Sequence, residues 1–110
     1  MNPQRFLCSQ LVSLTHRCDD APGDSVVNLE EIWTNGAIVE AEMPVKKGVE
    51  VELRCGPAFF AGRIVEVESH DFGWRLEVEF SPRTLWNPDE FRPEHMLDPS
   101  SLVRPNRPEN

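Results

Sequence analysis

Apolar and charged residues alternate strictly in two segments of this chain, residues 49–55 and 74–80. A period of two is typical of strands that turn one face to a core and the other to water. In both segments the outward positions are mostly glutamates, which are more typical of a solvated face than of a catalytic pair. The pattern therefore predicts half-buried strands rather than helices.

Turn residues divide the rest of the first eighty residues into similar short segments. Gly and Pro, joined by Asp, Asn and Ser, recur every eight to twelve residues, and a helical period is absent. We expect Gly62 to mark a bend or bulge, because it has no side chain to pack. Strands are predicted at 11–15, 25–29, 36–42, 49–55, 58–68 and 72–80, and the predicted fold class is all-β, a small six-stranded antiparallel barrel.

The chain has 110 residues, which is room for one domain. Six of the ten prolines lie from Pro82 onward, and their spacing excludes a long helix. One short helix remains possible, with Asn87 as its cap and Pro88 at its first position. We predict a leader at 1–9, the barrel at 10–80, a C-terminal packing extension at 81–102 and a disordered tail at 103–110.

The net charge is -8, and residues 26–80 hold eleven acidic against five basic residues. Nucleic-acid affinity depends on Lys and Arg that displace counterions from phosphates, so DNA and RNA are not expected partners. No apolar stretch is long enough to span a membrane, and no secretory signal is visible at the start. We expect a cytoplasmic protein.

Cysteine and histidine give no recognisable reactive or metal-binding motif. Cys8, Cys18 and Cys55 are odd in number and widely spaced, which favours reduced thiols, although a Cys8–Cys18 bridge stays open. Zinc sites usually bring their ligands in close pairs, and only His16 and Cys18 approach such a pair. Cys55 with His70 lacks a recognisable oxyanion site. No cofactor or metal is expected, and the protein is not expected to be an enzyme.

Residues 26–80 resemble the PilZ domain, a six-stranded bacterial barrel known mainly as a receptor for cyclic di-GMP. The resemblance rests on an Asn-Leu strand leading to Gly36-Ala37, the connection 44–48, and the segments 62–65 and 76–80. It implies a bacterial regulatory module. The family's ligand site needs an Arg-x-x-x-Arg before the first strand and an Asp/Asn-x-Ser-x-x-Gly after it.

Both of these ligand motifs are altered here. Arg5 keeps the first arginine, but Ser9 stands in the place of the second. Asn28 is kept, whereas Glu30 replaces the serine and three extra residues precede Gly36. Two guanidinium groups grip a doubly charged dinucleotide better than one, so cyclic di-GMP binding is not expected. The alternatives are a receptor with a reduced site made of Arg5, Asn28 and Gly36, helped by Arg17 or a partner chain, and an unrelated barrel that binds a metal or a small molecule.

The C-terminal extension concentrates large apolar side chains among turn formers. We expect them to pack onto the barrel, because a short domain needs additional apolar cover. The competing interpretation makes them anchors for an unidentified protein partner, since aromatic and Met residues often anchor interfaces. The candidate partner-binding residues are Trp33, Trp86, Phe91 and Met96.

Overall fold

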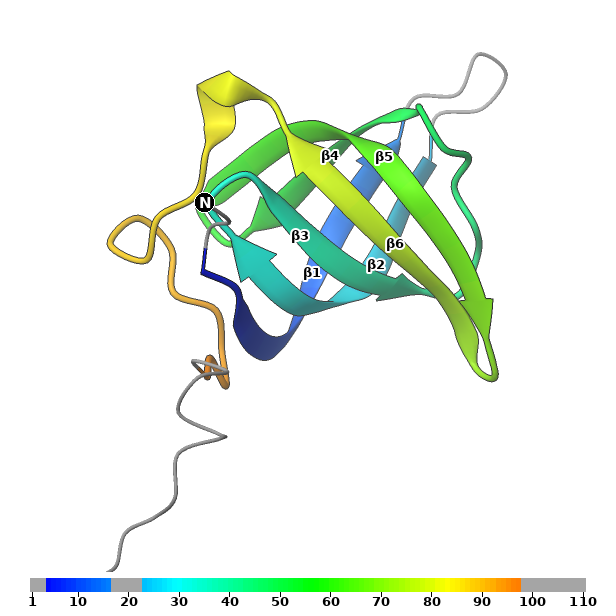
Figure 1. Ribbon diagram of the computed structural model, residues 1–110, viewed down its shortest axis with the longest axis horizontal. Coiled ribbons are helices and arrows are strands. Elements are labelled where there is room, and N and C mark those ends of the chain that lie inside the picture. Colours follow the sequence, from blue (N-terminus) through cyan, green and yellow to red (C-terminus); the bar gives the residue numbers. More distant parts are fainter. Residues whose placement is uncertain (1–3, 17–22, 98–110) are drawn as a thin grey trace, which may run out of the picture.

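The computed structural model describes residues 4–16 and 23–97. Six strands and one turn of 3-10 helix follow each other along these ranges (Figure 1). They are β1 (Phe6–His16), β2 (Gly23–Trp33), β3 (Gly36–Ala41), β4 (Glu50–Cys55), β5 (Ala58–His70), β6 (Gly73–Phe80) and η1 (Pro82–Thr84).

All neighbouring strands pair antiparallel and close into a barrel with the order β1-β2-β3-β6-β5-β4. The pair that closes the barrel is the shortest, because only Ser13–His16 of β1 meet β4. The predicted all-β, six-stranded antiparallel barrel is confirmed. Closure removes the free edges that an open sheet of this size would expose.

The barrel interior is filled by aliphatic and aromatic side chains from every strand. Among the described residues, no polar or charged side chain is buried in it. Phe60 and Phe80 stack at one end, with ring centroids 5.0 Å apart. The fully buried side chains include Leu14, Leu29, Leu53, Ile64, Leu76 and Val78.

β1 and β2 are longer than predicted, and both contain an irregularity in the pairing register. β2 runs on to Trp33 because its pairing with β3 shifts between Leu29 and Glu31. The shift adds one residue, so Leu29 and Ile32 both face the core although they are three positions apart. β1 likewise begins at Phe6, so the end of the predicted leader belongs to a strand.

In β5 the predicted position of the irregularity is wrong. Gly62 pairs regularly with Val51 and Phe80, and the register shifts at Val65 instead. A Cβ atom at residue 62 would overlap the carbonyl oxygen of Glu79. The glycine is thus needed for the close approach of β5 and β6, not for a bulge.

The segment after β6 covers the barrel end at which the first part of β1 lies, and Figure 1 shows it running from η1 past that strand. Leu7 exchanges two backbone hydrogen bonds with Leu97, and the Ser9 amide donates to the Glu94 carbonyl. These contacts use the stretch of β1 that β4 does not reach. Asn87 caps the amides of residues 89 and 90, but a turn forms there instead of the predicted short helix.

Candidate functional site

Arg5, Trp33 and Gly36 form one stack at the end of β2. The Arg5 guanidinium carbon lies 3.8 Å from the centre of the Trp33 ring. The same indole covers Gly36, where a Cβ atom would lie 2.6 Å from the ring. Arg5 also reaches Glu31, with 3.5 Å between Nη1 and Oε1. Two of the three residues of the reduced ligand site are therefore brought together, but around an indole that fills the space between them.

Asn28, the third residue of the reduced ligand site, lies on β2, five positions before Trp33. Its side-chain oxygen accepts a hydrogen bond from the Ser9 hydroxyl at 3.4 Å. Its neighbour across the β2–β3 pair is Glu40, whose carboxylate contacts the His70 ring. The surroundings of Asn28 are thus acidic rather than basic.

Glu30 adds a further carboxyl to this surface. Partial burial raises the pKa of Glu30, and a hydrogen bond to Glu40 and the charge of that carboxylate raise it further, while Arg75 and His70 oppose the shift. A phosphate placed here would meet carboxylates that already repel each other. Arg17, proposed as a helper of the reduced site, lies outside the described residues.

The candidate anchors for a partner are mostly enclosed by the protein itself. Trp33 and Trp86 are both buried. Trp86 donates its indole N–H to the Phe91 carbonyl at 2.7 Å and meets Phe6 edge-on, with centroids 5.7 Å apart. Phe91 and Met96 are half-buried against the core. Trp86 belongs to the hydrophobic core and Trp33 is buried under Arg5, so neither tryptophan is an exposed anchor. Trp86, Phe91 and Met96 of the extension pack against the barrel core.

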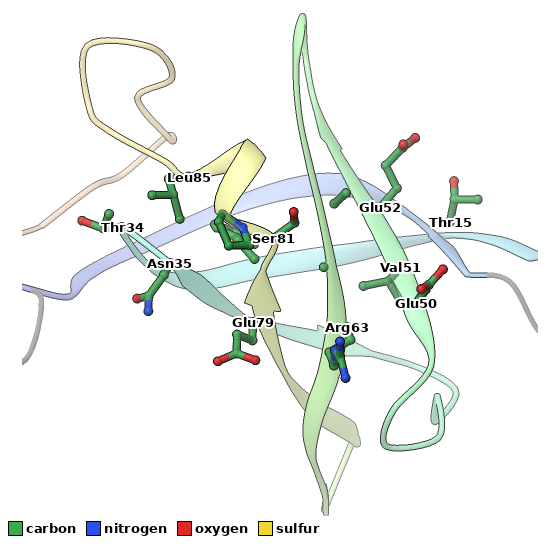
Figure 2. A pocket seen from close by; sticks show the side chains of 14 residues that line it. Thr15, Thr34, Asn35, Glu50, Val51, Glu52, Arg63, Glu79, Ser81 and Leu85 are labelled. Atoms are coloured by element: carbon green, nitrogen blue, oxygen red, sulfur yellow. The ribbon is translucent and has the colours of Figure 1, made fainter.

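A hollow of about 1010 Å³ lies on the outside of the barrel, and we call it the acidic hollow. Figure 2 shows that its labelled side chains come from several separate segments of the chain. Three carboxylates and one guanidinium line it, so its formal charge is negative. The lining residues are Thr15, Thr34, Asn35, Glu50, Val51, Glu52, Ala61, Gly62, Arg63, Glu79, Phe80, Ser81, Pro82 and Leu85.

Small residues of β5 and a fixed wall after β6 create this hollow. Ala61 and Gly62 leave its floor almost without side chains. The Thr84 hydroxyl accepts from the Ala61 amide and donates to the Ala61 carbonyl, both at 3.0 Å. The Trp86 amide also donates to the Thr34 carbonyl at 2.8 Å, which ties the wall to the β2–β3 turn. The hollow is preformed, because backbone hydrogen bonds hold its walls.

Three apolar side chains on β1, β2 and β5 are exposed, and the sequence analysis missed them. Leu11 is 70% exposed, Val26 66% and Phe59 50%, and we call these three residues the apolar patch. Each belongs to an apolar doublet whose other member, Val12, Val27 or Phe60, faces the core. These doublets interrupt the alternation of apolar and polar residues. The interruption is the sequence signal from which the exposed apolar residues could have been found.

Strand pairing places the patch and the hollow in adjacent rows. One row runs Val26, Ser13, Arg54 and Phe59 across β2, β1, β4 and β5. Two positions further along each strand, the next row runs Asp24, Thr15, Glu52 and Ala61. Successive outward side chains on one strand are neighbours, so Arg54 and Phe59 adjoin the hollow at Glu52 and Ala61. Ser13 and Arg54 lie between Val26 and Phe59 in the first row, so Phe59 is the member of the patch that borders the hollow.

A third row extends the hollow, in which Glu50 and Glu79 flank Arg63 from the two neighbouring strands. Within the described ranges, neither of these glutamates takes part in an ion pair within 4.0 Å. Glu52 is paired with Arg54 at 3.2 Å. With Arg63 between these two carboxylates, the third row has a formal charge of -1.

The two thiols in the described ranges show no sign of reactivity, and Cys18 lies outside those ranges. Cys8 and Cys55 are free and buried, and burial raises the pKa of each to about 12. Residues 4–16 and 23–97 contain no group of three His, Cys, Asp or Glu side chains placed to hold a metal ion. The same ranges contain no helix that is long and apolar enough to cross a membrane.

No family model matches this chain, and neither a curated protein nor a solved structure shows significant similarity to it.

Proposed function

We propose that this chain is a bacterial regulatory or protein-interaction module with a PilZ-like barrel that has lost cyclic di-GMP binding. It acts without catalysis, by contact with a protein partner. The proposal combines the sequence resemblance to the PilZ domain with the surroundings of Arg5.

The observation that carries it is the stack of Arg5, Trp33 and Gly36. The guanidinium that resembles the family's first phosphate-binding arginine lies on an indole and beside Glu31. Freeing it for a phosphate would break both contacts and leave the carboxylate facing the ligand. These losses reduce the gain from a single charge-assisted contact, worth about 1.5–3 kcal/mol, and the second arginine of the family's motif is missing.

A protein partner is favoured over a small ligand by the exposed surface of β1, β4 and β5. Apolar side chains on a sheet face beside a preformed hollow are typical of sites where proteins meet.

Calorimetry with cyclic di-GMP tests the proposal. We expect no saturable heat at micromolar protein for the intact chain, and the same result for Arg5→Ala. Micromolar binding that disappears in Arg5→Ala would instead establish the alternative, a receptor with a reduced site. Because Arg5→Ala also uncovers Trp33, its thermal midpoint is measured alongside to show that the variant is folded.

A further inference from the structure

We infer that the apolar patch and the acidic hollow together form the docking surface for an extended, basic segment of a partner protein, in which Arg or Lys residues flank apolar ones. The inference deepens the proposed function and rests on it, because it names the surface and the chemistry of the partner.

The negative formal charge of the acidic hollow favours a partner segment that is positively charged. Glu50 and Glu79 line the hollow without an ion pair among the described residues, and Arg63 is the one basic residue lining it. Complementary charges speed encounter and exclude wrong partners, which here are acidic segments and phosphate backbones.

The apolar part of the segment is placed by the row that precedes the hollow. Phe59 and Val26 lie in one row, and Leu11 lies two positions before Ser13 of that row. A segment crossing from this row into the next at β5 passes from the exposed ring of Phe59 to the open floor at Ala61. Its side chains must therefore change from apolar to basic along its length.

The way in which the barrel closes decides how such a segment binds. Beneath the hollow β4 pairs with both β1 and β5, so these paired stretches offer no free edge for an added strand. Binding must rely on side chains that fill the preformed hollow and cover the patch. A volume of about 1010 Å³ matches the upper range of ligand pockets, about 300–1,000 Å³, and is open enough for a few residues of a peptide.

Fluorescence anisotropy with a labelled peptide of alternating Arg and Leu tests the inference on the full chain. We expect saturable binding, and none for the matched peptide with Glu in place of Arg. The double variant Glu50→Gln with Glu79→Gln should raise the dissociation constant roughly three- to tenfold, as expected for two partly exposed charge contacts. The control double variant Glu68→Gln with Glu90→Gln, which makes the same change in net charge elsewhere, should leave it within twofold.

A second pair of variants tests the apolar patch. Phe59→Ser removes an exposed ring from the patch, whereas Phe72→Ser removes a ring that is 91% exposed between β5 and β6. Both are surface changes, so both variants should fold, and only the first should weaken binding. The inference would be overturned if Phe59→Ser and Phe72→Ser weakened binding equally, or if the two Glu→Gln double variants did. Equal binding of the Arg and Glu peptides would overturn it as well.

Failure of this inference and failure of the proposed function are distinguishable. If the Arg peptide does not bind and cyclic di-GMP does not bind either, the docking surface is wrong and the proposed function stands. If cyclic di-GMP binds through Arg5, the proposed function itself fails, whatever the peptide does.

Discussion

Cys8 and Cys55 carry thiols that can form hydrogen bonds, but both side chains pack in the barrel core as small apolar groups. The Cys8 thiol donates to the Leu29 carbonyl at 3.6 Å, and both sulfurs lie within the hydrophobic cluster. Burial disfavours the thiolate, which raises the pKa of each group from 9.0 to about 12. The two cysteines are therefore inert core residues at neutral pH.

This burial predicts a loss of stability at high pH. The thiol pKa is higher in the folded than in the unfolded chain, so the stabilising contribution is complete below pH 9 and is lost as the pH rises from about 9 to about 12. Few other groups interfere, because the chain contains no tyrosine. Urea denaturation should show a steeper decline of the unfolding free energy in this range for the wild type than for Cys8→Ala with Cys55→Ala. Parallel pH profiles would contradict the assignment.

Gly36 and Gly62 show how single residues shape the surface without contributing side chains to it. Gly36 lets the Trp33 indole lie flat, and Gly62 lets β5 meet β6. Both positions combine a missing side chain with a close neighbour from elsewhere in the chain. Such a requirement is invisible to local sequence patterns, which explains why Gly62 was expected to form a bulge.

At the scale of elements, the segment after β6 is part of the packed barrel, because its side chains cover one end of the core. Trp86 is buried between Phe6 and the Phe91 carbonyl, and Phe91 tilts against Phe60 with centroids 6.3 Å apart. Without this segment, the unpaired half of β1 and one end of the core would face water. Cover of this kind is important in a domain of this size, whose core is small.

We predict that Trp86→Ala lowers the unfolding free energy by about 3–5 kcal/mol, through lost burial and a cavity. Leu85→Ala, at the neighbouring and partly exposed position, should have a much smaller effect. Chemical denaturation of both variants measures the difference.

A chain ending before η1 should be less stable still, so a loss of partner binding in such a chain would report unfolding and not docking. A truncated chain with an unchanged midpoint would show that the extension is not part of the fold.

The elements also show how far the sequence predicts this structure. β4 and β6 keep a strict period of two, β3 is an apolar run between turn residues, and all three were placed within one residue. β1 and β2 were predicted too short, because polar residues and the register shift near Glu30 hide their continuation. The acidic hollow could not be predicted, since its residues come from four strands, a turn and η1 and meet only after the barrel closes. The apolar doublets were readable, but their common face depends on strand order.

At the scale of the whole molecule, the net charge of -8 acts against the compact state. The described ion pairs are Arg5–Glu31, Lys47–Glu66, Arg54–Glu52 and His70–Glu40. All four involve partly exposed side chains, where a pair contributes about 0–1 kcal/mol. Repulsion among the unpaired carboxylates should therefore outweigh the attraction within these pairs.

We predict that added salt stabilises this protein. Raising the ionic strength from about 0.01 M to about 0.15 M shortens the screening length from about 30 Å to about 8 Å, which weakens repulsion across the barrel. The thermal midpoint should rise, as followed by circular dichroism. Glu50→Gln with Glu79→Gln should raise the low-salt midpoint and reduce the response to salt, because two of the repelling charges are gone. A midpoint that falls with salt would mean that the ion pairs dominate. If the prediction holds, the hollow retains carboxylates that weaken the fold, as expected when they serve a partner instead.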